Sequence, residues 1–359
     1  MRGIYRQEVP AGISEDAVGY SEVGEGIHGR SGDSSSLQGA FSLLEILVAM
    51  AILSLLLVVM ASLASLTSTT SSRTLGKLES FETARAAFDT ITRTLRQATL
   101  LSQITYNDPT TPTDFQRSSD LHFVSGSETA LGIPKPGSEL SNGVFFQAPL
   151  GLAVGTDIQS ATSLLSCVGY FISYGDQPNR PSKLLGLTPA RYRYRLFQFF
   201  QPREEMSIYT NTITNISGIS TANLAYKTTE WFSNDVSTMK NCRVLAENVI
   251  GLVFLPIFAD GTVPDIYHWN SRDQGTAKSL HRLPAAMKIV LVAIDEKSAA
   301  RLGNAATPPD LMPTDLFLDP KDFEADLAAL KDRLNAREPK LNYEIFATEV
   351  GLSSGDSGL

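Results

Sequence analysis

The segment GAFSLLEILVAMAIL at residues 39–53 begins a long apolar run near the start of this 359-residue chain. From Phe41 to Ser72, Glu45 is the only ionisable side chain. About 20 consecutive apolar residues in a helix are enough to cross the hydrocarbon core of a bilayer. We therefore expect a single membrane-spanning helix over residues 43–66.

Glu45 is an unusual residue to find in such a segment. A carboxylate in the middle of a membrane helix costs about 2.5–3.5 kcal/mol on insertion scales, so acids there are rare and commonly functional. We therefore expect Glu45 to have a positively charged partner and a role in the function of the protein.

Small residues, then Phe41, then Glu45 in an apolar helix resemble the N-terminus of type IV prepilins and pseudopilins. In those proteins a prepilin peptidase cuts before the Phe and methylates the new amine. The resemblance implies a cut between Ala40 and Phe41, with Phe41 methylated and Glu45 as the fifth mature residue. The residue before the cut is usually Gly, but a cut after Gly39 would make Glu45 the sixth residue.

An ordinary single-pass anchor and a secretory signal are the alternatives to a prepilin helix. A secretory signal carries its small residues after the apolar region, at the cleavage site. Here Gly39 and Ala40 precede the apolar region, which favours the prepilin interpretation.

Residues 1–40 are rich in Gly, Ser and acids and have no apolar periodicity. Such a composition cannot bury enough apolar surface to fold, so we expect a disordered leader. Its few Arg residues give little guidance from the positive-inside rule. The peptidase motif instead implies a leader in the cytoplasm, a helix in the inner membrane and a periplasmic or extracellular C-terminal domain.

The apolar helix is expected to continue into an amphipathic second half. Apolar residues recur at steps of three, four or seven, which marks one face of a helix; they are Leu75, Leu78, Phe81, Phe88, Ile91 and Leu95. We predict one helix to about Leu101, and a division into leader 1–40, helical spine 41–102 and globular domain 103–359.

The globular domain is expected to be rich in strands. Runs with strand character lie at 121–125, 143–149, 168–174, 191–196, 248–258, 287–294 and 343–350, and a helix is expected at 320–336. The alternation in RYRYRL breaks after Leu196, which suggests a bulge. Pro256 should place its strand at a sheet edge. A long helix followed by antiparallel strands predicts an α+β fold.

The phrases LHFVSG, VFFQAPLG, RYRYRLFQFFQP, LAENVIGLVFLP and LPAAMKIVLVAIDEKSAARL are similar to the Verru_Chthon cassette protein C family. Members of that family are prepilin-type proteins. The order of these segments also resembles minor pseudopilins of the type II secretion J class and minor pilins of the W class. The resemblance implies a prepilin peptidase and other pilin-like subunits as partners, and no assigned biochemical activity.

Composition limits the remaining functions. The net charge of −8 gives no general attraction to nucleic acid. The two cysteines, Cys167 and Cys242, form no CxxC motif. One disulfide between them is allowed if the domain is exported, and two free thiols are equally consistent with the sequence.

No catalytic or metal site is predicted. The four histidines are scattered, and no HExxH, GxSxG, P-loop or GxGxxG motif stands in a suitable context. We expect no cofactor. The acidic pairs Glu204-Glu205 and Asp295-Glu296 are expected to lie in solvated turns.

Alternation in RYRYRL puts the Arg and Tyr side chains on opposite faces of a strand. Nucleic-acid binding would need aromatic and basic groups on one face. We therefore expect Arg191, Arg193 and Arg195 to form a solvated face opposite acids.

These features favour a non-catalytic minor pilin or pseudopilin of a type IV pilus-like or type II secretion-like assembly. A membrane-tethered binding domain that uses a pilin-like anchor is the alternative, and an anchored hydrolase has no supporting motif.

Overall fold

A computed structural model provides the structure of the protein. It describes residues 42–106, 110–133, 141–151, 164–178, 187, 189–208, 229–273, 277–309, 311 and 315–352, with only the backbone for 67–78. The chain forms two compact units, Met1–Leu63 and Ala64–Leu359. The leader predicted at 1–40 lies outside the described residues.

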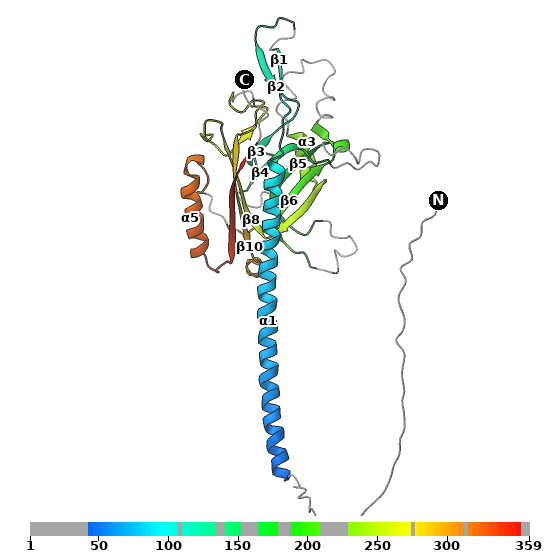
Figure 1. Cartoon of the computed structure of the whole chain (residues 1–359), viewed down its shortest axis with the longest axis vertical. Helices are drawn as coiled ribbons and strands as arrows, with labels where there is room; N and C mark the ends of the chain where they lie inside the picture. Colours follow the sequence, from blue (N-terminus) through cyan, green and yellow to red (C-terminus); the bar gives the residue numbers. More distant parts are fainter. Residues whose placement is uncertain are drawn as a thin grey trace, which may run out of the picture. The chain divides into compact units, whose positions relative to one another are not determined.

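A single helix, α1 (Leu43–Leu95), begins in the first unit and ends in the second (Figure 1). It stops six residues before the predicted end near Leu101. Beyond Leu95 the chain turns, and the Thr99 amide donates to the Gln147 carbonyl at 2.9 Å instead of continuing the helix. The prediction was too long because this pairing with a distant strand has no local signal.

The second unit contains a six-stranded antiparallel sheet in the order β7-β6-β5-β4-β3-β9. Its strands are β3 (Val124–Ser127), β4 (Asn142–Pro149), β5 (Leu165–Gly175), β6 (Arg193–Gln201), β7 (Cys242–Glu247) and β9 (Trp269–Asn270). The register of β6 against β7 shifts between Leu196 and Phe197, which confirms the predicted bulge.

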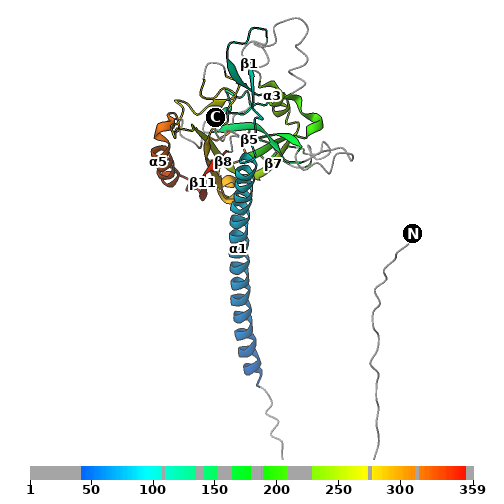
Figure 2. The same cartoon turned by 45° about the horizontal axis from the view of Figure 1, so that its top comes forward.

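A second, three-stranded antiparallel sheet has the order β11-β10-β8. Its strands are β8 (Val249–Ile257), β10 (Ala286–Ile294) and β11 (Tyr343–Gly351), labelled in Figures 1 and 2. Strand β8 lies at the edge of this sheet, as Pro256 predicted. A separate hairpin consists of β1 (Gln103–Tyr106) and β2 (Phe115–Ser118).

Short helices complete the second unit. They are α3 (Glu230–Ser237), α4 (Glu296–Arg301), α5 (Phe323–Ala336) and the 3-10 turns η3 (Arg203–Glu205) and η4 (Pro320–Asp322). Together η4 and α5 confirm the helix predicted at 320–336.

The six-stranded sheet is buried on both faces. Along β5, Val168, Tyr170 and Ile172 lie in the larger core, while Cys167 and Phe171 lie in a smaller one. The second half of α1 enters the larger core through Ala84, Ala87, Phe88, Ile91 and Leu95. Helix α3 supplies Trp231, Phe232 and Val236 to the smaller core. The α+β prediction is confirmed.

Candidate functional site

Ser42 is the N-cap of α1. Its side-chain Oγ accepts from the Glu45 amide at 3.2 Å, and its carbonyl accepts from the Glu45 and Ile46 amides at 2.9 and 3.3 Å. Ser at the N-cap with Glu three residues later is the spacing of a capping box. This role was not predicted, although residues 42–45 carry the S-x-x-E pattern.

Glu45 thus lies in the first turn of the helix. The helix dipole places partial positive charge at this end, which stabilises a carboxylate. Ala40 and Phe41, the residues of the predicted cut, lie outside the described residues. The positively charged partner expected for Glu45 therefore stays a prediction.

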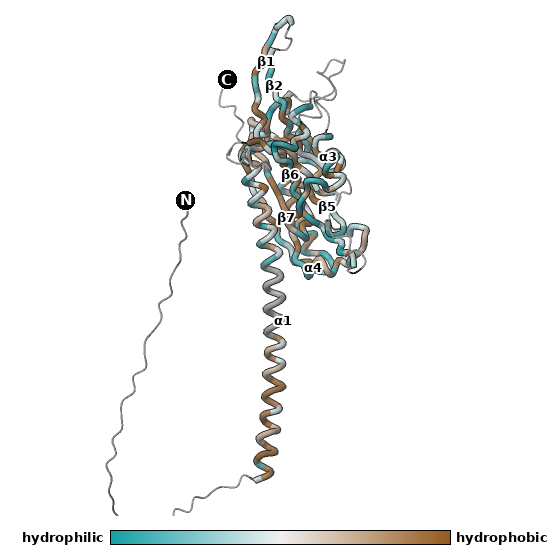
Figure 3. The backbone as a smooth tube through the Cα atoms, turned by 90° about the vertical axis from the view of Figure 1, so that its right-hand side faces the viewer, coloured by the Kyte–Doolittle hydropathy of each residue, from teal (hydrophilic) through white to brown (hydrophobic). Residues whose placement is uncertain are grey.

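The apolar span that follows is Leu43–Leu66, 24 residues with a mean hydropathy of 2.9, and it is the one helix of the described chain long and apolar enough to cross a membrane. At 1.5 Å per residue it is about 36 Å long, against about 30 Å of hydrocarbon. Figure 3 shows this stretch of α1 in the colours of hydrophobic residues. Its large apolar side chains are between 47% and 78% exposed. Lipid or other helices must therefore cover it.

The polar groups inside the span are satisfied locally. Ser54 Oγ donates to the Ala51 carbonyl at 2.9 Å, and Ser62 Oγ donates to the Val59 carbonyl at 3.2 Å. Internal bonding of this kind suits a segment that has no water to bind in hydrocarbon.

The two cysteines are free thiols. Cys167 on β5 pairs with Gln201 of β6, and Cys242 on β7 pairs with Phe199 of the same β6. One strand lies between them and their partners on β6 are two residues apart, so their Cα atoms are separated by more than two strand spacings, about 10 Å. A disulfide needs about 4.4–6.8 Å, so this fold favours the free-thiol alternative. Burial raises the pKa of each thiol to about 12.

The arginine face predicted on β6 does meet acids, but it is not solvated throughout. Arg191 lies 2.8 Å from Glu296 and 3.2 Å from Glu247. Arg195 is 1% exposed, and its Nε donates to Glu247 at 3.1 Å. It also donates to the carbonyls of Gly175 and Arg191. The prediction was wrong for Arg195 because alternation assigns a face but not what covers it.

The predicted solvated turn at Asp295-Glu296 is also wrong. Asp295 is buried and caps α4, where it accepts from the Ser298 amide at 2.8 Å and from Asn342 Nδ2 at 2.9 Å. Neighbouring Glu296 pairs with Arg193 of β6 and with Arg191, two residues before that strand. By contrast, Glu204 and Glu205 are exposed in η3, as expected.

His122 has a structural position in the second unit. Trp231 Nε1 donates to its Nδ1 at 3.0 Å, so the ring is neutral and its Nε2 donates to Asn270 Oδ1 at 2.8 Å. Burial, followed by the charge of Arg272, lowers the pKa of His122 to about 3. Among the described residues no three His, Cys, Asp or Glu side chains gather as metal ligands.

Comparisons with known proteins bear on the N-terminus. Residues 35–61 match the family model described as the prokaryotic N-terminal methylation motif. A type IV-like pilin from Thermus thermophilus aligns with 9% identity over 76% of this chain and 96% of its own, at a TM-score of 0.30, too low to support an argument. None of the curated proteins compared matches the chain. The chain carries the N-terminal methylation motif of prokaryotic prepilin-like proteins, at the start of the long apolar helix α1.

Proposed function

We propose that the chain is a prepilin-type, membrane-anchored subunit, a minor pilin or pseudopilin of a type IV pilus-like or type II secretion-like assembly. One observation carries the proposal: the described helix begins within the methylation motif and exposes a 24-residue apolar surface with a single acid, Glu45, at its beginning. Membership in the Verru_Chthon cassette protein C family is part of this proposal.

Maturation would follow the motif. A prepilin peptidase removes the leader 1–40 by cutting between Ala40 and Phe41 and methylates the Phe41 amine. The spine 41–102 then anchors the subunit in the inner membrane, with the domain 103–359 on the far side. The role is structural and needs no catalytic group.

The Glu45 carboxylate would guide assembly. In a bundle of such helices it lies in low dielectric, where an unpaired charge is strongly disfavoured. The amine of Phe41, on its own chain or a neighbouring subunit, keeps its charge after methylation and can pair with Glu45. This pairing favours one register between adjacent helices.

Substitution Glu45→Val tests the proposal. The residues at the cut are unchanged, so intact-mass analysis of membrane material should still show a mature chain that starts at Phe41. The variant should fail to crosslink or co-purify with the other pilin-like subunits, because the charge pair is lost. A start at Met1 or beyond Val48 in the wild type would contradict the processing step.

Ser42→Ala is the matched control. It removes the side-chain cap of the same first turn and should cost about 0.5–2 kcal/mol of helix stability, but it keeps the carboxylate. If assembly fails equally in both variants, Glu45 acts through the helix end alone. If Glu45→Val assembles like the wild type, the acid has no assembly role.

A further inference from the structure

The hairpin β1–β2 has one apolar face and one polar face. Its register pairs Ile104 with Arg117 and Tyr106 with Phe115. Since alternate residues of a strand share a face, these four side chains lie together. The opposite face carries only polar side chains, namely Gln103, Thr105, Gln116 and Ser118.

The apolar face is open to solvent. Ile104 is 61% exposed, Tyr106 53% and Phe115 67%, and Leu101 just before the hairpin is 65% exposed. The rings of Tyr106 and Phe115 lie 5.1 Å apart, so the exposed groups form one patch. Exposed apolar side chains gathered in this way are typical of interaction sites.

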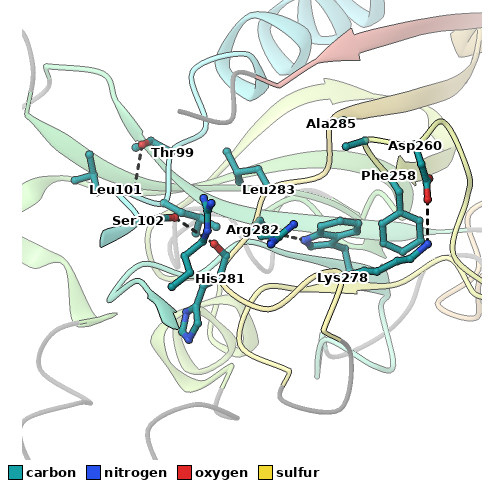
Figure 4. A pocket seen from close by; sticks show the side chains of 14 residues that line it. Thr99, Leu101, Ser102, Phe258, Asp260, Lys278, His281, Arg282, Leu283 and Ala285 are labelled. Carbon is teal, nitrogen blue, oxygen red and sulfur yellow. Dashed lines mark hydrogen bonds and ion pairs between the residues drawn. The ribbon is translucent and has the colours of Figure 1, made fainter. Parts of the chain in front are cut away.

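A cavity of about 430 Å³ adjoins this face through Arg117. Figure 4 shows the side chains that line the cavity. Arg117, Leu101 and Ser102 belong to its lining, so the hairpin face and the cavity share an edge. The remainder comes from Thr99 and Leu100, from the segments 258–260 and 278–285, and from Trp269.

Positive charge dominates the cavity. Its lining has the cations Arg117, Lys278 and Arg282 and the single carboxylate Asp260. Lys278 already pairs with Asp260 at 3.1 Å and lies 4.8 Å from the centre of the Phe258 ring.

Arg282 differs from Lys278 because the Arg282 guanidinium has no ion-pair partner among the described residues. Its backbone is fixed, since the carbonyl accepts from Trp269 Nε1 at 3.0 Å. Its side chain is exposed and has no hydrogen bond or ion pair within the described parts of the chain. This guanidinium could donate two parallel hydrogen bonds to a carboxylate that enters the cavity.

We propose that this hairpin–pocket surface, defined by Leu101, Ile104, Tyr106, Phe115, Arg117 and Arg282, docks an acidic and apolar segment of another protein. The acidic side chain enters the cavity toward Arg282, and the neighbouring apolar side chains cover the hairpin face. The exposed aliphatic and aromatic groups favour a protein over a sugar. The net charge of −8 disfavours an anionic lipid surface, which would meet the field of the whole molecule.

The proposal does not rest on filament assembly, so it can be tested separately. The full mature chain is placed in phosphatidylcholine nanodiscs and titrated against a fluorescent peptide in which Asp alternates with Leu and Phe. One comparison peptide has Lys in place of Asp, and another has Ser in place of Leu and Phe. Only the acidic and apolar peptide should bind saturably, and more weakly at high salt.

Two variants locate the binding. Arg282→Glu and Phe115→Ser should each weaken the peptide affinity tenfold or more. Arg282→Lys keeps the charge but loses the bidentate geometry, so it should weaken the affinity less than Arg282→Glu does. The controls are Lys297→Glu, an exposed cation on α4, and Leu318→Ser, an apolar side chain 69% exposed outside the surface. Both controls should bind like the wild type.

Several results would overturn the proposal. They are failure of the acidic and apolar peptide to bind, equal binding by Arg282→Glu, and binding to phosphatidylglycerol vesicles in place of the peptide. The Glu45→Val variant should bind the peptide like the wild type. The peptide result therefore does not depend on the outcome of the assembly test.

Discussion

Gly169 shows how closely single residues are constrained in the smaller core. A Cβ built on this residue would lie 2.1 Å from Cδ1 of Phe145, its partner across β4 and β5. Phe145 cannot retreat easily, because its ring stacks on Phe232 with centroids 3.8 Å apart. The glycine is therefore required by packing against an aromatic ring.

Replacing Gly169 with Ala should destabilise the protein by about 1–3 kcal/mol, the usual cost of overpacking a core. Gly175→Ala is the matched control, because it lies on the same strand and its added Cβ would meet nothing within 4 Å. Urea unfolding of the full chain in nanodiscs measures both. Equal stability of the two variants would contradict the packing argument.

His122 should make stability depend on pH. The unfolded chain protonates this residue below about pH 6.5, whereas burial lowers the folded pKa to about 3. Its contribution is therefore complete above pH 6.5 and is lost as the pH falls toward 3, by about 1.4 kcal/mol per pH unit.

His122→Gln removes this titration. It should lower stability at pH 7, because Trp231 and Asn270 lose their partner, yet flatten the decline between pH 6 and 4.5. Unfolding curves at several pH values measure the slope. An unchanged slope would mean that His122 does not stay neutral in the folded protein.

At the scale of elements, periodicity predicted what was long and strongly patterned. The apolar half of α1 followed from the length of its apolar run. The amphipathic half of α1, the central strands and α5 followed from their periodicity, and the phase break after Leu196 located a real bulge. The short elements α3, α4, β1, β2, β7 and β9 were missed because two to eight residues carry too little pattern. Arg195 and Asp295 were misjudged since their burial depends on partners far along the chain.

The candidate site, too, was only partly predictable from the sequence. Glu45 and the apolar span were evident from the sequence, because a lone acid in an uncharged run has no ordinary explanation. The Arg282 pocket was not, since its lining comes from segments before β1, within β2, and on either side of β9. Only the folded chain brings these segments together.

The strand order of the six-stranded sheet also decides whether the two cysteines can form a disulfide. With β6 between them, Cys167 and Cys242 should both titrate as free thiols in freshly isolated protein. Burial raises both pKa values, so reaction with a thiol reagent at pH 8 should be slow until denaturant is added. A thiol count on denatured, non-reduced protein measures this, and a count of zero would show a bridge and a different strand arrangement.

At the scale of the whole molecule, the two halves of helix α1 lie in different environments. The residues of α1 up to Leu63 belong to the first unit and expose apolar side chains, while residues from Ala84 onward enter the large core of the second. The Glu45→Val and hairpin–pocket experiments address these two units separately. One concerns helix association in the membrane, and the other concerns recognition by the globular domain.

Because β11 lies near the C-terminal end of the described residues, the three-stranded sheet can be completed only late in synthesis. Strands β3 to β7 pair with their neighbours in sequence, so they can assemble while later segments are still being made. Strand β10 receives its second partner only when Tyr343–Gly351 arrives, and Phe346 then meets Phe88 of α1 at 5.8 Å between ring centroids. Until this strand emerges, a nascent chain therefore leaves β10 and Phe88 without the partners that β11 provides. Chaperones and proteases can distinguish an interrupted chain by these uncovered groups, and completion of β11 removes the signal.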